Sequence, residues 1–440
     1  ASGDTITFPT GTTIVNNGTQ TGFGRTGTVD WETTPQTGSF QATTGKGYFM
    51  NTTSGALTLT TPASPSAGDI FAAADYAATW QTNALTIAPH AGVKIGGVSA
   101  NVVLSTEGQS VTFVYVDSTQ GWVNVQDSTS NARGNPNLVA TGGTITTCGN
   151  CKIHTFTSPG TFTVCQVSTT AANNVVSYMV VAGGGSAGTN HGAGGGGGGF
   201  REVKTPLTPY TASPLDGYPN APNRVTVTAA AFPITVGAGG AGTPLDSNAN
   251  TGNPSTFSTI TSAGGGKGGT GNTPFRDGGN GGSGGAGSSG PGTTLGSAGT
   301  GNTPPVSPAQ GTNGGTGGTD NFSWRSGGSG GGATAAGGST PPGPSSPGPS
   351  AAGGAGATTN ISGSPVGYAG GGGSGGSFQG GGASPCGSGL AGQATIAQGG
   401  TPTMANAAAN RGGGGGGAGS DQPAGSNGGS GIVIIRYKFQ

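Results

Sequence analysis

Glycine is distributed very unevenly along this chain, and that unevenness limits what the chain can fold into. Of the 100 glycines in 440 residues, 21 lie in residues 1–180 and 79 lie beyond them. Glycine weakens the interiors of helices and strands because it loses more backbone entropy on folding than any other residue. We therefore expect a boundary near residue 180, with different kinds of structure on its two sides.

Residues 1–126 have the pattern of an all-β domain. Short runs rich in Thr, Val, Ile, Phe and Tyr are separated by Gly, Pro, Asn and Ser, and residues 56–60 and 111–116 alternate in polarity. Strands with two unlike faces pack into a sandwich or small barrel, so a β-sandwich-like module is expected. No stretch has helical spacing with a cap, which predicts almost no α-helix. The predicted strands are residues 5–8, 12–15, 28–32, 47–52, 56–60, 69–73, 84–88, 110–116 and 122–125.

The second half is predicted to be a glycine-rich region framed by strands. Residues 127–142 are polar and turn-rich, as in a linker. Residues 143–181 would form a β frame, and the apolar run at 431–439 would close the glycine-rich domain of residues 182–440. Disorder accompanies high net charge, and the net charge here is zero, so we expect order. The strand-like runs before the last one are 144–147, 152–156, 161–167, 175–181, 224–228 and 232–236.

The order that suits consecutive glycines is the polyglycine-II helix. This geometry has three residues per turn and no internal hydrogen bonds, so its N–H and C=O groups need neighbouring chains as partners. The six glycines at 194–199 would form a helix with neighbours on every side. The Gly-Gly-x triplets of 278–286 would place Asn280, Ser283 and Ala286 along one outer edge. A collagen helix is excluded because the glycines do not keep a strict period of three, and a flexible linker of this size between strands would be unusual.

Several motifs in residues 28–126 resemble a β module of phage virion proteins. The motifs are GYFMNTTSGALTLT at 47–60, PASPSAGD at 62–69, Asp75-Tyr76 and YVDSTQGW at 115–122. The module recurs in tail-fibre-like proteins of phages, especially those that infect marine cyanobacteria. The resemblance implies a virion appendage that is a homotrimer.

Residues 143–440 resemble the glycine-rich domain at the ends of many phage tail proteins. The matching segments are, in order, VVSYMVVAGGG at 175–185, ITVGAGG at 234–240, STFSTITSAGGG at 255–266 and NGGSGIVIIRY at 427–437. Related polyglycine-II bundles occur in the distal adhesins of some tailed phages, where the loops that join the helices recognise the host surface. The resemblance implies the fold and leaves the ligand open.

Recognition residues are expected in the segments between the glycine helices, because loops on a rigid scaffold carry binding. The richest segments are 204–224, 272–276, 320–325, 340–350, 360–368 and 377–386. Aromatic faces flanked by polar and charged groups are typical of sugar-binding sites, and the densest such group surrounds Trp324. The candidate receptor-binding residues are Phe322, Trp324, Arg325, Phe275, Arg276, Tyr210, Tyr218 and Tyr368. The alternative is that these aromatics only cover an apolar flank of the bundle.

The cysteines allow three interpretations. Cys148, Cys151 and Cys165 are candidates for a disulfide formed after the protein leaves the cytoplasm. The C-x2-C pair with His154 could also begin a zinc site, although the Gly-Asn between the cysteines equally suits a hairpin turn. The third interpretation is that the thiols are inert. Cys386 stands alone in a glycine-rich segment and is expected to be free.

Composition excludes several function classes. The 14 Lys and Arg equal the 14 Asp and Glu, so no basic surface is available for nucleic acid. No apolar run approaches the roughly 18 residues of a membrane helix, and no basic segment opens the chain as a secretion signal would. The three histidines and the absence of a close carboxylate pair beyond residue 180 leave little material for catalysis. We expect no enzyme activity, no catalytic residues, no metal and no cofactor.

The two resemblances imply a phage virion structural protein, most simply a tail fibre or a fibre-tip adhesin, and the composition agrees with a non-enzymatic role. The first module would attach it to other tail or fibre proteins, and the glycine-rich domain would bind a host surface glycan or an outer-membrane protein without inserting into the membrane. Trimerisation would raise avidity. The chain begins at Ala1, which fits removal of an initiator methionine and assembly in the host cytoplasm before display on the virion. The alternatives are a structural head-decorating or collar fibre, and an ice-binding or extracellular-matrix protein.

Overall fold

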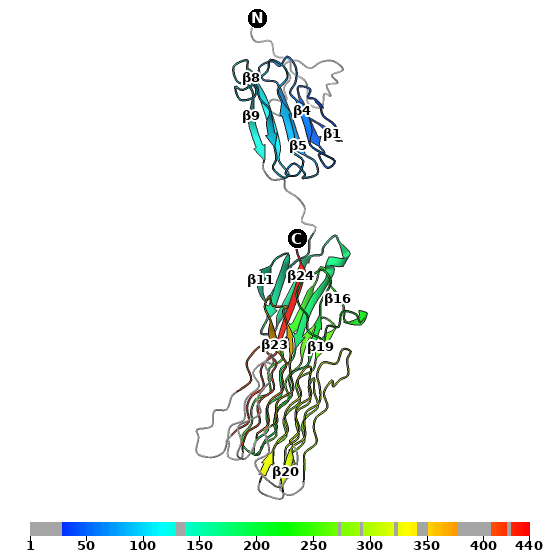
Figure 1. The fold of residues 1–440 in the computed structure, drawn as a ribbon, viewed down its shortest axis with the longest axis vertical. Helices are drawn as coiled ribbons and strands as arrows, with labels where there is room; N and C mark the ends of the chain where they lie inside the picture. Colours follow the sequence, from blue (N-terminus) through cyan, green and yellow to red (C-terminus); the bar gives the residue numbers. More distant parts are fainter. Residues whose placement is uncertain are drawn as a thin grey trace, which may run out of the picture. The chain divides into compact units, whose positions relative to one another are not determined.

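The computed structural model divides the chain into two compact units, residues 1–134 and residues 135–440 (Figure 1). It describes residues 29–128, 137–271, 274–290, 294–320, 324–340, 351–375, 406–419 and 424–440. Outside this set lie the predicted strands at 5–8 and 12–15, Phe322, and the candidate segments 341–350 and 377–386 with Cys386. Helix in the described residues consists of two short 3-10 turns, η1 (Ala171–Asn174) and η2 (Ala221–Asn223). The predicted all-β class is confirmed.

The first unit is a sandwich of two sheets. One sheet has the order β1-β3-β5-β8-β9, with β1, β3 and β5 parallel and β8 and β9 antiparallel. The second sheet has the order β2-β4-β6-β7. Phe71 and Phe113 stack with ring centroids 5.1 Å apart and share one buried core with Leu59 and Leu85 of the second sheet. The strands are β1 (Asp30–Gln36), β2 (Phe40–Gln41), β3 (Lys46–Met50), β4 (Leu57–Thr60), β5 (Ile70–Asp75), β6 (Leu85–Ala88), β7 (Val102–Leu104), β8 (Ser110–Asp117) and β9 (Gly121–Ser128).

The strand prediction for this unit missed two elements and ended β1, β5 and β9 two to four residues early. β2 and β7 span two and three residues, too few to show an alternating pattern. β1 continues past the predicted end at Glu32 to Gln36 and includes Pro35. Because β1 is an edge strand, the N–H group that Pro35 lacks is not needed for pairing.

The second unit begins as another two-sheet sandwich. One sheet has the order β11-β12-β24-β14-β15, with β16 also paired to β14, and the other has the order β10-β13-β17-β18-β19. The predicted linker is too long, because Val139–Thr141 at its end form β10 and pair with β13. The strands are β10 (Val139–Thr141), β11 (Thr144–Cys148), β12 (Cys151–Phe156), β13 (Gly160–Gln166), β14 (Val175–Val181), β15 (Phe200–Val203), β16 (Val225–Thr226), β17 (Ala231–Thr235), β18 (Ser255–Phe257), β19 (Ile260–Ser262) and β24 (Ile432–Lys438).

The C-terminal strand β24 lies in the middle of its sheet, between β12 and β14. One face of this sheet packs against the second sheet, with Val433 and Ile435 in a core that includes Phe162. The other face, with Ile432 and Ile434, packs against a separate cluster. Burial on both faces explains why the apolar run in β24 is continuous rather than alternating. Two short hairpins complete the elements: β20 (Gly318–Asp320) with β21 (Trp324–Ser326), and β22 (Ala357–Thr359) with β23 (Val366–Tyr368).

The glycine-rich segments form a bundle of polyglycine-II helices that extends from these sheets (Figure 1). In the segment 194–199, three successive N–H groups donate to three different segments, and the next three return to the same three segments. The six acceptors, in order, are the carbonyl oxygens of Gly328, Gly415, Gly266, Gly331, Gly412 and Ala263. Its own carbonyl groups accept bonds from three further segments, through the N–H groups of Gly185, Ser283 and Gly372. The period of three and the neighbours on every side are those predicted.

Contact between bare backbones explains why this region needs glycine. A Cβ atom on Gly195 would lie 2.2 Å from the carbonyl oxygen of Gly185, and one on Gly184 would lie 2.0 Å from that of Gly413. These are positions of neighbouring main chain, which cannot rotate away as a side chain can. At these glycines the bundle is therefore close-packed through N–H and C=O groups, with no room for a side chain.

The predicted outer edge of the Gly-Gly-x triplets is wrong. Asn280 is exposed, but Ser283 and Ala286 are fully buried. The chain reverses within this stretch, because the N–H group of Gly285 donates to the carbonyl oxygen of Gly279. The triplets therefore belong to two antiparallel helices, and the second of these helices is inside the bundle.

Candidate functional site

The turns that connect the glycine helices at the end away from the sheets form the candidate site. We call this end the free end; Figure 1 shows it as the tip that carries β20. The described turn residues there are 189–191, 245–247, 270–271, 274–276, 288–290, 294–295, 318–320 and 324–326. These turns come from widely separated parts of the sequence.

Hydrogen bonds join neighbouring turns directly. The N–H group of Asp246 donates to Thr189 Oγ1 at 3.0 Å, and that of Gly271 donates to the Thr189 carbonyl oxygen at 3.1 Å. Asn190 Nδ2 donates to Asp246 Oδ1 at 3.0 Å. Asn190, with φ of 52°, and His191, with φ of 58°, both adopt the left-handed conformation, which asparagine tolerates better than most residues. The turns are thus held as one connected surface.

Phe275 and Arg276 lie on the next turn, and both are half-buried. The N–H group of Thr270 donates to the Phe275 carbonyl oxygen at 2.7 Å, and Arg276 Nε donates to the Gly271 carbonyl oxygen at 3.4 Å. A Cβ atom on Gly290 would lie 2.2 Å from Arg276 Cζ, so the guanidinium occupies the space above that glycine. The turn therefore holds an aromatic ring and a cation side by side in sequence on an ordered backbone.

The hairpin β20–β21 brings the second predicted cluster to the same end. Asp320 pairs with Trp324, and Thr319 pairs with the half-buried Arg325. Between this hairpin and Arg276 lies the segment 288–290. The Ser288 N–H donates to the Arg276 carbonyl oxygen at 2.9 Å, and a Cβ on Gly317, next to β20, would lie 2.8 Å from the Ser288 backbone.

Two exposed leucines at the free end escaped the sequence analysis. Leu245 and Leu295 are each 42% exposed, and Ser289 forms a β-bridge with Leu295. Each stands alone in a polar turn, so neither produces a pattern. The available signal was their rarity, since large aliphatic residues are scarce within the glycine-rich sequence.

With this geometry established, comparison with known families is informative. Residues 157–438 match the model of a glycine-rich domain family, which is well over half of the chain. The chain belongs to this family. No curated protein matches the sequence.

The three predicted tyrosines lie at the other end of the glycine-rich domain, where they support packing. Tyr368 is 3% exposed and belongs to the cluster against β24, so its predicted receptor contact does not fit its position. Tyr210 packs on the same cluster, 5.2 Å from the Arg436 guanidinium, and Tyr218 is covered by Arg224 at 4.3 Å. For these residues, the interpretation that aromatics cover an apolar flank agrees with the structure.

A buried polar cluster holds the segments that carry Tyr210 and Tyr368. Glu202 Oε2 accepts a hydrogen bond from the Ser213 N–H at 2.8 Å, and Glu202 Oε1 accepts one from the Thr359 hydroxyl. Burial raises the pKa of the Glu202 carboxyl. Arg436 donates to the carbonyl oxygen of Pro209 at 3.0 Å. Candidate segments 204–224 and 360–368 are therefore held against the sheets by these bonds.

The structure contains Cys148, Cys151 and Cys165 as free thiols, so the predicted disulfide is absent from it. Cys148 and Cys151 face each other across the predicted hairpin turn, while Cys165 is exposed on β13 of the other sheet. Cys151 and His154 are three residues apart on β12 and so lie on opposite faces. His154 Nδ1 bonds to the Gly142 carbonyl oxygen and Nε2 to the Tyr437 hydroxyl, at 2.7 and 3.2 Å. The C-x2-C zinc interpretation therefore fails on geometry.

Within the residues that the structure describes, no three His, Cys, Asp or Glu side chains come together in a way that could hold a metal ion. No described helix has the length and hydropathy to cross a membrane.

Proposed function

We propose that this protein is a phage virion structural protein, a tail fibre or fibre-tip adhesin, that binds the host surface through the free end of its glycine bundle. One observation carries the proposal: the two predicted aromatic and basic clusters, around Trp324 and Phe275, occur at the same end of one bundle. The three predicted tyrosines lie at the other end of the domain and pack against its side chains instead.

The architecture suits presentation of binding residues. The closely packed glycines of the bundle have no room for a Cβ atom, so large and varied side chains fit only at the turns and on the outside. At the free end, the described turns offer aromatic, aliphatic and guanidinium groups on a backbone already fixed by hydrogen bonds. Such preorganised surfaces lose little entropy on binding. A host glycan, or a glycan-bearing outer-membrane protein, is the ligand that this mixture fits.

The proposal includes non-enzymatic action, a place on the virion surface, and a homotrimer joined to other tail or fibre proteins through the first unit. Repetition of a weak site on several copies raises the effective affinity without new contacts. Adhesion would then depend on both units, with the glycine-rich domain supplying contacts and the first unit supplying copies.

Cell binding by purified full-length protein tests this function. Fluorescently labelled chain is titrated onto a panel of marine cyanobacterial strains, and the variants Trp324→Ala and Phe275→Ala with Arg276→Ala are compared with it. We expect binding to at least one strain and at least tenfold weaker binding by the variants. The matched control is Arg224→Ala, an exposed arginine beside Tyr218 at the other end, which should bind as wild type.

Thermal unfolding of each variant shows whether the fold is kept. Wild-type binding by both free-end variants would contradict the proposal, as would the lack of any bound strain. Immunolabelling that locates the protein on the capsid rather than the tail would favour the head-decorating alternative instead.

A further inference from the structure

The first unit has a sheet whose outer face is mainly apolar and carries no charged side chain among its paired residues. In the sheet β1-β3-β5-β8-β9, residues alternate between the core and the outside. The core side holds Tyr48, Phe71 and Phe113. The outward positions, which we call the outer face, carry two kinds of side chain. The apolar ones are Trp31, Phe49, Ile70, Ala72, Ala74, Val114, Val116 and Val123, and the uncharged polar ones are Ser110, Thr112, Gln126 and Ser128. An antiparallel sheet with one solvated side normally has polar residues there.

Register shows that the outer face is continuous. Ile70, Val114 and Val123 are directly paired across three adjacent strands. The rings of Trp31 and Phe49 are in tilted contact at the other edge, with centroids 4.9 Å apart. Trp31 is 38% exposed and Val116 is 45% exposed, although both are large and apolar. Contiguous apolar surface of this kind marks an interaction site.

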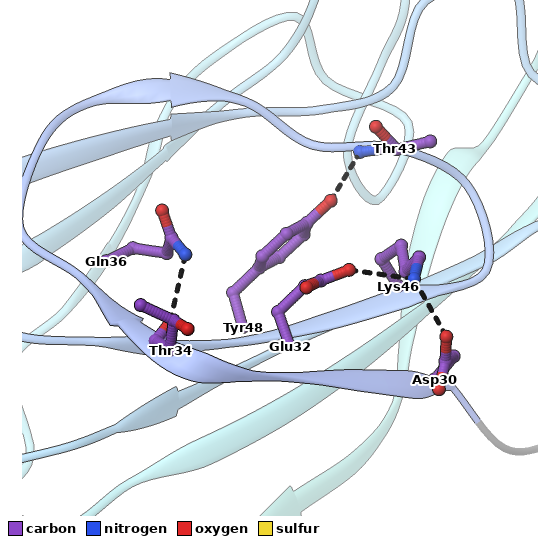
Figure 2. Close-up of polar contacts among 7 residues, drawn as sticks. All are labelled: Asp30, Glu32, Thr34, Gln36, Thr43, Lys46 and Tyr48. Atoms are coloured by element: carbon purple, nitrogen blue, oxygen red, sulfur yellow. Dashed lines mark hydrogen bonds and ion pairs between the residues drawn. The ribbon is translucent and has the colours of Figure 1, made fainter.

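The charges at the β1 edge lie on the opposite side of the sheet. Figure 2 shows Lys46 between Asp30 and Glu32, with Nζ 2.7 Å from a carboxylate oxygen of each, on the same side as Tyr48. Tyr48 belongs to the core, so this group of charges borders the core side. Among the paired residues of the sheet that the structure describes, no outward position carries a charged side chain.

We propose that the outer face is a self-association surface, covered by another copy of the same chain. An uncharged, mainly apolar face can pack against a copy of this unit without placing like charges together, and it offers nothing to a charged partner. Five strands spaced about 4.8 Å apart and about six residues long give roughly 500 Å² per copy. Two copies would bury about 1,000 Å², which reaches the lower limit of a specific interface.

This surface deepens the proposed function, since it supplies the copies that avidity needs, but it does not depend on ligand binding. Sedimentation equilibrium of the full chain measures it directly. We expect wild type to be oligomeric at micromolar concentration. Val116→Glu and Trp31→Glu each place a carboxylate in the contact and should weaken association at least tenfold.

Val103→Glu is the matched control. Val103 is 60% exposed, like Val116 a valine on a strand, but it lies on β7 of the other sheet. It should leave association unchanged, and unfolding curves should show that all three variants fold. A monomeric wild type, or unchanged association in the two outer-face variants, would overturn the proposal.

The two proposals fail in different ways. An outer-face variant should bind cells weakly as a monomer yet still lose further binding when Trp324→Ala is added. A free-end variant should remain oligomeric. Loss of assembly in the free-end variants, with normal assembly in the outer-face variants, would contradict the self-association surface alone.

Discussion

The sheets of the second unit and the bundle that extends from them are continuous in sequence but are held together in opposite ways. Val181 ends β14 with its side chain buried in an apolar cluster. Two residues later, at Gly183, a Cβ atom would lie 2.0 Å from a neighbouring carbonyl oxygen. The sheets are stable because side chains fill the space between layers. The bundle is stable because side chains are missing and hydrogen-bonding groups meet directly.

Because the bundle depends on backbone hydrogen bonds, polar side chains at its rim can supply acceptors that a missing neighbour would have supplied. A rim helix lacks some neighbours, so some of its N–H groups would have no acceptor. Asn280 Oδ1 accepts from the Thr300 N–H at 2.8 Å, and Asn313 Oδ1 accepts from the Gly301 N–H at 2.9 Å. The amide oxygen thus replaces a missing backbone carbonyl.

The largest effect is expected from a substitution at Gly195, inside the bundle. Gly195→Ala should destabilise the second unit by about 4 kcal/mol, because its Cβ atom would press on the Gly185 carbonyl and separate hydrogen-bonded helices. Urea unfolding measures the change. The control is Gly160→Ala at the start of β13, where the nearest atom is a ring carbon of Phe156 at 3.3 Å. Equal costs for the two variants would show that backbone contact does not hold the bundle together.

Sequence alone predicted the longer strands and the glycine helices, but it missed most short strands, such as β15, β18 and β19, and the arrangement of the elements. Strand runs such as 175–181 were predicted because alternation and β-branched residues report burial on one or both faces. The helical form of 194–199 followed from what consecutive glycines can do. Which helices become neighbours could not be predicted, because every polyglycine-II helix offers the same hydrogen-bonding groups. The fate of Ser283 and Ala286 depended on that neighbour order.

The same limit explains the outcome for the candidate site. Phe275 and Trp324 come to one end because the chain between them runs toward the sheets and returns to the free end. Short turns in the sequence do not show where each reversal occurs. Tyr368 was predicted to bind a receptor because it ends the segment 360–368, which joins glycine-rich stretches. Its burial depends on β22–β23 folding over β24, a contact between residues about seventy positions apart with no local signal.

A smaller effect is expected at the junction between the two regions. Ser255 Oγ donates to the Val181 carbonyl oxygen at 2.8 Å and accepts from the Gly237 N–H at 2.9 Å, and Ser255 is fully buried. Ser255→Ala leaves both partners unsatisfied and should cost about 2 kcal/mol of unfolding free energy. Thr261→Ala on the neighbouring strand, where the side chain is exposed, should cost only a few tenths. A negligible effect at Ser255 would mean that water reaches the junction.

The smallest effect concerns pH and is expected from the side-chain-filled region. Burial lowers the pKa of His154 below its ordinary value of 6.5, despite its hydrogen bond to Gly142. Below pH 6.5 the unfolded chain therefore binds a proton that the folded chain does not. Stability contributed by neutral His154 is present above pH 6.5 and falls as the pH decreases, by at most about 1.4 kcal/mol per pH unit.

Glu202 acts in the opposite direction. Because burial raises its pKa, the folded chain keeps a proton that the unfolded chain releases above pH 4.5, so its contribution is present at low pH and is lost as the pH rises. Urea midpoints at pH 5, 6 and 7 separate the two groups. His154→Gln should remove the loss of stability on acidification and leave only the Glu202 trend, whereas His90→Gln in the first unit should leave the second unit unchanged. If the urea midpoint of His154→Gln falls with decreasing pH as steeply as that of wild type, the pH dependence of stability does not arise from His154.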